Sequence, residues 1–85
     1  MPDSIHVKIY SRPGCHLCDD AKDVVDRIRR RYPFELQIID IESDPALESL
    51  YGFEIPVVTI NGNKAFKYKV DEIEFERKVR RLWNK

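Results

Sequence analysis

The sequence feature that most constrains the fold of this chain is a change in the spacing of apolar residues. It occurs around a short loop next to both cysteines. Apolar and polar residues alternate over Ile5–Tyr10, which is the period of a β-strand. From Cys15 to about Tyr32, apolar residues recur at the spacing of one helix face. Residues 11–14 between these segments contain Pro and Gly, which indicates a loop. The sequence therefore predicts a strand, a loop and a helix, with Cys15 and Cys18 at the start of the helix.

The middle of the chain continues the alternation of strand and helix. A strand is expected over Phe34–Ile41, and its apolar residues on both faces predict a place inside a sheet covered by helices. Asp44 followed by Pro45 predicts the N-cap and first residue of a short helix. Gly52 is expected to end that helix in a left-handed conformation.

The last third of the chain predicts a hairpin and a final helix. The β-branched run after Pro56 is typical of a strand, and Asn61-Gly62 is the preferred pair for a two-residue type I′ turn. A second, lysine-rich strand is expected over Lys64–Lys69. Asp71 predicts the start of the last helix. Four residues are expected to form the inner face of that helix: Phe75, Val79, Leu82 and Trp83.

These elements follow the order β-α-β-α-β-β-α, which predicts an α/β fold. The first two strands are joined by a helix and must be parallel, whereas the Asn-Gly hairpin adds antiparallel strands. The result is a four-stranded mixed sheet flanked by helices. At 85 residues, we expect one domain that spans residues 1–85.

Charge and composition exclude some classes of binding partner and indicate where in the cell the protein works. The 15 basic and 15 acidic residues give no net charge, which argues against a nucleic-acid-binding protein. No apolar stretch is long enough to span a membrane, and the first residues lack the pattern of a secretory signal. We therefore expect a cytoplasmic protein, and a monomer. In the cytosol, a disulfide is more often transient and catalytic than structural.

The spacing and position of Cys15 and Cys18 point to thiol–disulfide chemistry. A thiolate is the nucleophile in disulfide exchange, and the free N–H groups and dipole at a helix N-terminus stabilise that anion. Cys15 would lie at the very start of the helix, and Cys18 one turn further in. We expect Cys15 to attack a substrate disulfide and Cys18 to resolve the mixed disulfide.

Charged neighbours are expected to tune this site. His16 as a cation would favour the Cys15 thiolate, whereas Asp19 and Asp20 would oppose it, so we expect a moderately activated thiol. Arg12 precedes Cys15 by three residues, where its cation could stabilise the thiolate or bind a substrate carboxylate. For His16, an exposed helix start without a role remains an equal alternative.

A CxxC pair can have roles other than redox catalysis. A c-type haem site needs His directly after the second cysteine, where this chain has Asp19. A zinc or iron–sulfur site within one chain needs about four ligands, so we expect no metal. A non-catalytic module remains the alternative, with a CxxC pair that is idle or holds a metal or iron–sulfur cluster across a dimer.

The motifs resemble those of a small glutaredoxin-like family of the thioredoxin superfamily, long filed as a domain of unknown function. Val7–Asp19 has the strand, the Pro-Gly and the Cys-His-Leu-Cys followed by an acid that this family shows. Ile39–Ile41 and Tyr51–Val57 resemble its later segments. The resemblance implies a thioredoxin/glutaredoxin-like fold and a thiol–disulfide oxidoreductase.

The same resemblance implies roles for residues outside the cysteine pair. Pro56 would be the cis-proline of the superfamily, and the backbone of Ile55 would pair with a bound peptide or glutathione. Arg12 matches the basic residue that helps glutaredoxins to bind glutathione. The Gly-Gly that usually precedes an acid in glutaredoxins is missing from Lys67–Asp71, which leaves Asp71 as the possible partner of glutathione.

These implications define the expected partners. The substrate would be a disulfide-containing protein or a small thiol compound. The reductant would be glutathione or a thioredoxin-reductase-like protein, and no cofactor is expected beyond glutathione as a possible co-substrate.

Overall fold

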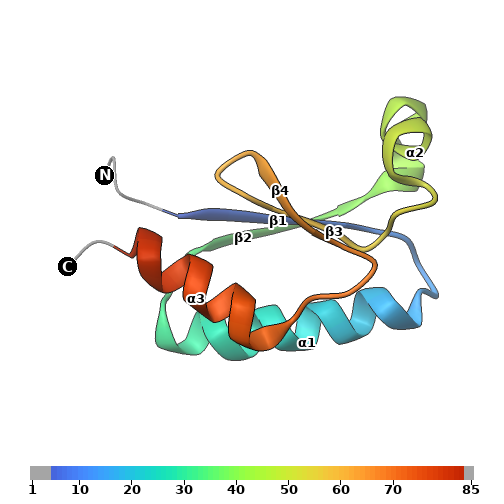
Figure 1. Cartoon of the computed structure of the whole chain (residues 1–85). Coiled ribbons are helices and arrows are strands. Elements are labelled where there is room, and N and C mark those ends of the chain that lie inside the picture. Colours follow the sequence, from blue (N-terminus) through green and yellow to red (C-terminus); the bar gives the residue numbers. More distant parts are fainter. Residues whose placement is uncertain (1–4, 84–85) are drawn as a thin grey trace.

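The computed structural model describes residues 5–83, which form a mixed sheet with three α-helices (Figure 1). The elements follow the predicted order, with one additional 3₁₀ turn, η1. Their bounds are β1 His6–Ser11, α1 His16–Arg31, β2 Glu35–Asp40, η1 Ile41–Ser43, α2 Pro45–Tyr51, β3 Val57–Ile60, β4 Asn63–Lys67 and α3 Glu72–Leu82.

The four strands lie in the order β2-β1-β3-β4, so the first strand of the chain is central. β1 pairs with β2 in parallel and with β3 antiparallel, and β4 completes the hairpin. This confirms the predicted mixed sheet. The predicted interior position of the second strand is wrong, because β2 is an edge strand and its Ile38 is 48% exposed. Phe34 and Ile41, the buried apolar residues at the two ends of the predicted segment, lie just outside the strand itself.

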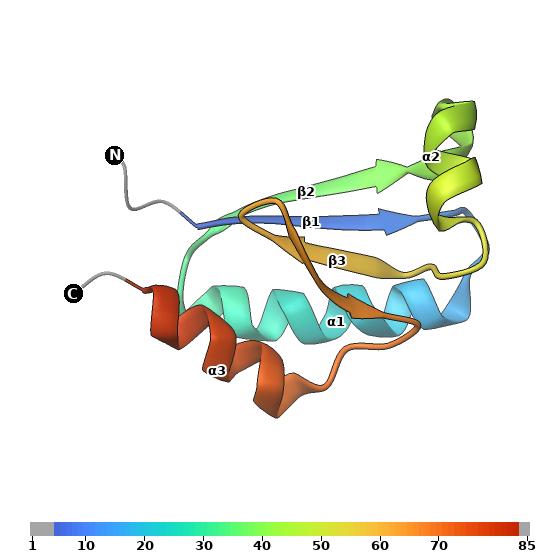
Figure 2. The ribbon, with the colours of Figure 1, turned by 45° about the horizontal axis from the view of Figure 1, so that its top comes forward.

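The two long helices cover the same face of the sheet. Figures 1 and 2 show α1 and α3 side by side on one face, and α2 beyond the end of the sheet on the other side. The core lies between the sheet and these two helices. Its fully buried members come from the sheet and from both helices: Val7 and Ile9 of β1, Val58 of β3, Val25 and Ile28 of α1, and Phe75 and Val79 of α3.

Leu82, which is predicted on the inner face of the last helix, is exposed, and so are Leu17 of α1 and Leu50 of α2. Leu17 is 48% exposed, Leu50 65% and Leu82 44%. The reason is the length and placement of the helices, since α3 lies beside the later turns of α1 and leaves its first turn free (Figure 2). Leu82 is the last residue of α3. Helix α2 packs instead through Tyr51, whose ring lies 4.6 Å from that of Tyr10.

The predicted caps and turn are confirmed with one exception. Asp44 and Asp71 cap α2 and α3 by accepting backbone N–H bonds. Asn61 and Gly62 have φ values of 52° and 86°, as a type I′ turn requires. Gly52 is not left-handed, since its φ is −54°, so the predicted role of this glycine is wrong.

Arginines near the end of α1 are held by partners within the chain. Arg27 and Arg31 pair with Glu72 and Glu76 of α3, both at 2.9 Å. Arg29 donates to a backbone carbonyl, and Arg30 pairs within the helix. The two ion pairs of Arg27 and Arg31 join α1 to α3 at their exposed edges.

Over residues 5–83, none of the helices has the length and apolar character to span a membrane.

Candidate active site

The cysteine pair lies where the central strand ends and the first long helix begins. β1 ends at Ser11, and Gly14 turns the chain with a φ of 76°. Cys15 follows in an extended conformation and is the N-cap of α1. The predicted strand–loop–helix arrangement therefore places Cys15 just outside the helix and Cys18 in its first turn.

The two thiols differ in accessibility. Cys15 is partly exposed, whereas Cys18 is completely buried, and both are free thiols. The sulfur of Cys15 accepts a hydrogen bond from the backbone N–H of Cys18 at 3.2 Å. This N–H is one of the donors that a helix N-terminus leaves without a partner in the helix, so it can stabilise negative charge on Cys15.

Burial controls the acidity of the second thiol. It raises the pKa of Cys18 to about 11 from 9.0, and a hydrogen bond between the side chains of Cys18 and Cys15 acts in the same direction. A backbone hydrogen bond from Arg12 opposes this increase in the pKa. Cys18 is thus held as a neutral thiol behind the accessible Cys15.

The segment Ile55–Pro56 lies at the same end of the molecule as the cysteine loop. Its peptide bond is cis, as the family resemblance implies. Tyr10 pairs with Val57 across β1 and β3, so the residues after Tyr10 and those before Val57 leave the sheet together. Figures 1 and 2 both show the chain before β3 close to the start of α1. The structure therefore brings Ile55 and Pro56 to the end of the sheet where the cysteine loop begins.

Tyr68 is a neighbour of this segment that the sequence did not single out. Its backbone N–H donates to the carbonyls of Pro56 at 3.0 Å and Glu54 at 3.1 Å. Its φ is 71°, which is rare for a bulky residue. The absence of the expected Gly-Gly from Lys67–Asp71 was a sign in the sequence that an unusual residue occupies this turn.

Arg12 faces acidic side chains of the polypeptide. Its Nη2 donates to Glu48 Oε2 at 3.1 Å, and its Nε lies 3.4 Å from Glu42 Oε2. No local pattern in the sequence marks either acid, because both are distant from Arg12 along the chain. The predicted role of Arg12 in binding a substrate stays a prediction, and its guanidinium is already occupied.

The remaining predicted site residues are His16 and Asp71. His16 is the first residue of α1 and is exposed beside Cys15. The carboxylate of Asp71 accepts the N–H of Glu74 at 3.1 Å as the N-cap of α3. Their predicted roles toward a substrate also stay predictions.

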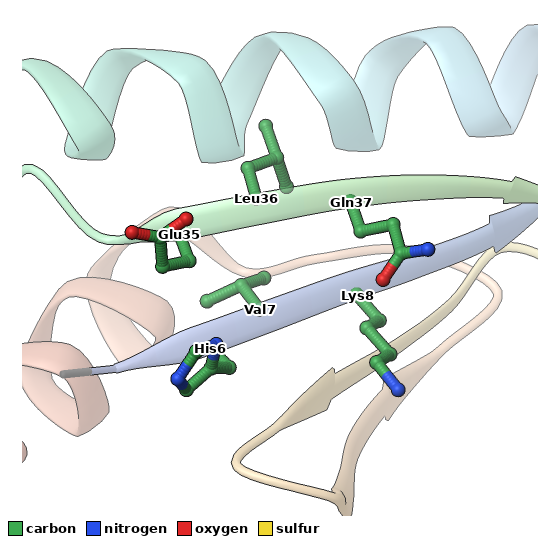
Figure 3. Close-up of a pocket in the computed structure, with 6 residues that line it drawn as sticks. All are labelled: His6, Val7, Lys8, Glu35, Leu36 and Gln37. Atoms are coloured by element: carbon green, nitrogen blue, oxygen red, sulfur yellow. The ribbon is translucent and has the colours of Figure 1, made fainter. Parts of the chain in front are cut away.

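Two shallow hollows lie along β1 and β2. One, of about 260 Å³, is lined by residues near the start of both strands, including His6, Lys8 and Gln37 (Figure 3). The other, of about 190 Å³, lies beside the cysteine loop and includes Arg12, Lys22 and Asp40. Only the second adjoins the candidate site. Among residues 5–83, no three His, Cys, Asp or Glu side chains form a group that could hold a metal ion.

The sequence is similar to a known protein family and to individual known proteins. Residues 6–80 match the family model described as "Glutaredoxin-like domain (DUF836)". The chain is 31% identical over 75 residues to a "Glutaredoxin-like protein YDR286C homolog" of Dictyostelium discoideum, which covers 81% of this chain and 69% of that protein.

Solved structures show the same fold. A structural genomics target protein from X. campestris superposes with a TM-score of 0.74 at 27% identity, over 88% of this chain and 96% of that one. A mutant thioredoxin from Halobacterium salinarum gives a TM-score of 0.68 at 18% identity, over 96% and 77% of the two chains. The chain has the thioredoxin fold and belongs to the glutaredoxin-like (DUF836) family.

Proposed function

We propose that this protein is a thiol–disulfide oxidoreductase that uses Cys15 as the nucleophile and Cys18 as the resolving thiol. The observation that carries the proposal is the contrast between the two sulfurs. Cys15 is accessible and accepts a backbone N–H bond at the start of α1, while Cys18 is buried one turn along the helix. This is the placement that stepwise disulfide exchange requires.

The reaction proceeds in two exchanges. The Cys15 thiolate attacks one sulfur of the substrate disulfide, that S–S bond breaks, and the first substrate thiol leaves with a proton. Cys18 then loses its proton and attacks the Cys15 sulfur, which releases the second substrate thiol. The substrate gains two electrons and two protons, and the enzyme is left with a Cys15–Cys18 disulfide.

An external thiol reductant completes the cycle. Glutathione or a thioredoxin-reductase-like protein would reduce the Cys15–Cys18 disulfide back to two thiols. We propose a disulfide-containing protein or a small mixed disulfide as the substrate, and a cytoplasmic monomer as the working form. Ile55 would pair with the bound substrate through its backbone next to Pro56, which agrees with the place of this segment beside the cysteine loop.

The test compares two variants with the same change at different positions. Cys15→Ser should abolish reduction of insulin and of a glutathione mixed disulfide, because the attacking sulfur is lost. In Cys18→Ser, Cys15 should still attack the substrate disulfide, but no second thiol is present to resolve the mixed disulfide. This mixed disulfide with a protein substrate should therefore accumulate and be visible by mass spectrometry.

Two results would contradict the proposal. One is full activity in Cys15→Ser. The other is an inactive wild-type protein whose dimer depends on both cysteines and contains stoichiometric metal or iron–sulfur cluster, which elemental analysis and absorbance would detect.

A further inference from the structure

We propose that Arg12 is a positioning residue that fastens the cysteine loop to α2 and η1, and that it does not bind the substrate. The inference rests on the proposed function, since it concerns how the same site is held in place. It departs from the role that the family resemblance implies for this arginine.

The contacts of the guanidinium join three segments of the chain. Arg12 lies in the loop between β1 and α1, Glu42 in η1, and Glu48 in the middle of α2. The distances are 3.1 Å to Glu48 and 3.4 Å to Glu42. The Nε atom is fully buried and makes no hydrogen bond despite its closeness to Glu42. One side chain thus bridges the loop and both elements beyond β2.

The end of α2 lies against this arginine. A Cβ atom on Gly52 would be 3.6 Å from Nη2 of Arg12 and 2.6 Å from the carbonyl oxygen of Glu48. The distance to Arg12 is an ordinary contact, whereas the distance to the Glu48 carbonyl is too short for a residue with a side chain, so glycine suits the end of α2. Gly52 is followed after two residues by the Ile55–Pro56 segment, so the position of α2 determines where that segment begins.

The charges around Arg12 do not favour an incoming anion. Two carboxylates surround one guanidinium, so the cluster of Arg12, Glu42 and Glu48 has a net negative charge. The adjoining hollow has one further cation, Lys22, and one further acid, Asp40. A substrate carboxylate would have to displace Glu48 from Arg12 and would meet a second acid.

The experiment measures kcat and KM for two substrates, insulin and a mixed disulfide of glutathione, with dithiothreitol as the reductant in both assays. In Arg12→Met, we expect kcat to fall about tenfold for both substrates, because a displacement of reacting groups by about 1 Å can cost up to about a hundredfold and a smaller displacement costs less. KM should change little for either. Arg12→Lys should recover part of kcat, since it keeps the charge but not the two-sided contact.

Glu48→Gln separates the two roles of Arg12. A positioning arginine loses one of its two charged partners in this variant and keeps Glu42, so kcat should fall for both substrates, by less than in Arg12→Met. A substrate-binding arginine would instead be freed, and KM for the glutathione substrate should decrease. The inference is overturned if Arg12→Met raises KM for the glutathione substrate alone, or if Glu48→Gln lowers that KM.

A matched control is the pair of variants Arg31→Met and Glu76→Gln. They remove the same charges from an exposed ion pair at the other end of α1. Both should leave kcat unchanged. Circular dichroism checks that all variants are folded, and Glu48→Gln carries the test if Arg12→Met does not fold.

A second readout does not depend on turnover. It is the equilibrium constant between the Cys15–Cys18 pair and dithiothreitol, which should shift several-fold in Arg12→Met and Glu48→Gln but not in the controls. If the wild-type protein reduces neither substrate, the proposed function fails. This constant then decides the inference, and values equal to the wild type would overturn it.

Discussion

The two cysteines lie within one helical turn of each other but differ in exposure and in hydrogen bonding. Cys15 lies outside the helix, where its sulfur receives a backbone N–H and stays accessible. Cys18 lies inside the first turn on the buried face, where the lack of water opposes its ionisation. The chemical difference between the two thiols therefore arises from position along the helix and from burial.

The raised pKa of Cys18 predicts a loss of stability at alkaline pH. The pKa is 9.0 without burial and about 11 in the folded protein, so between these values the unfolded chain releases this proton first. The free energy of unfolding of the reduced protein should therefore fall as pH rises from 9 to 11, because ionisation favours the unfolded state there.

Urea titrations across this pH range measure the effect. Cys18→Ala should lack this part of the pH dependence, whereas Cys15→Ser, which leaves Cys18 buried, should retain it. Parallel curves for the wild type and Cys18→Ala would show that the Cys18 proton does not contribute.

At the scale of elements, the ends of helices and strands are determined by two kinds of contact. The caps of α2 and α3 and the turn at Asn61-Gly62 use residues next to the element itself. The end of α2 is different. Gly52 is helical in conformation there, and its lack of a side chain leaves room for the backbone carbonyl of Glu48.

Gly52→Ala should therefore destabilise the protein although its backbone conformation suits alanine. A Cβ atom 2.6 Å from the Glu48 carbonyl must displace backbone. The cost should be about 1–3 kcal/mol, the range for overpacked sites. Thermal or urea unfolding measures it, with Ser49→Ala on the exposed surface of α2 as the control. An unfolding midpoint equal to the wild type would contradict the close approach.

The whole molecule depends on a one-sided core. Both long helices lie on one face of the sheet (Figure 2). Aromatic rings from the sheet side and from α3 meet between these layers. Phe75 of α3 is fully buried, with Phe34 at 5.8 Å and Phe66 at 6.1 Å between ring centroids. A domain of this size has a small core, so one such residue carries a large share of the stability.

Phe75→Ala should cost about 3–5 kcal/mol and leave the protein close to unfolding. Phe53→Ala removes the same atoms from a side chain that is 96% exposed, and it should change the stability by less than about 0.5 kcal/mol. Urea unfolding of both variants measures the contrast. Similar losses in the two would mean that the core does not centre on Phe75.

Local patterns in the sequence predict the order of elements, the caps of α2 and α3, the hairpin turn and the position of both cysteines at a helix start. These follow from periodicity and from residues that act on their immediate neighbours. The motifs around Cys15 and Cys18 also indicate the family.

Contacts between distant segments determine which strands lie at the sheet edges, which leucines stay exposed and which residues hold Arg12. The partner Glu48 is 36 positions away from Arg12, and no local pattern links them. The burial of Cys18 likewise depends on the sheet and helix that pack around it. Contacts of this kind form only when distant segments meet, so the sequence indicates the chemistry of the cysteine pair, and the fold determines how that pair is held.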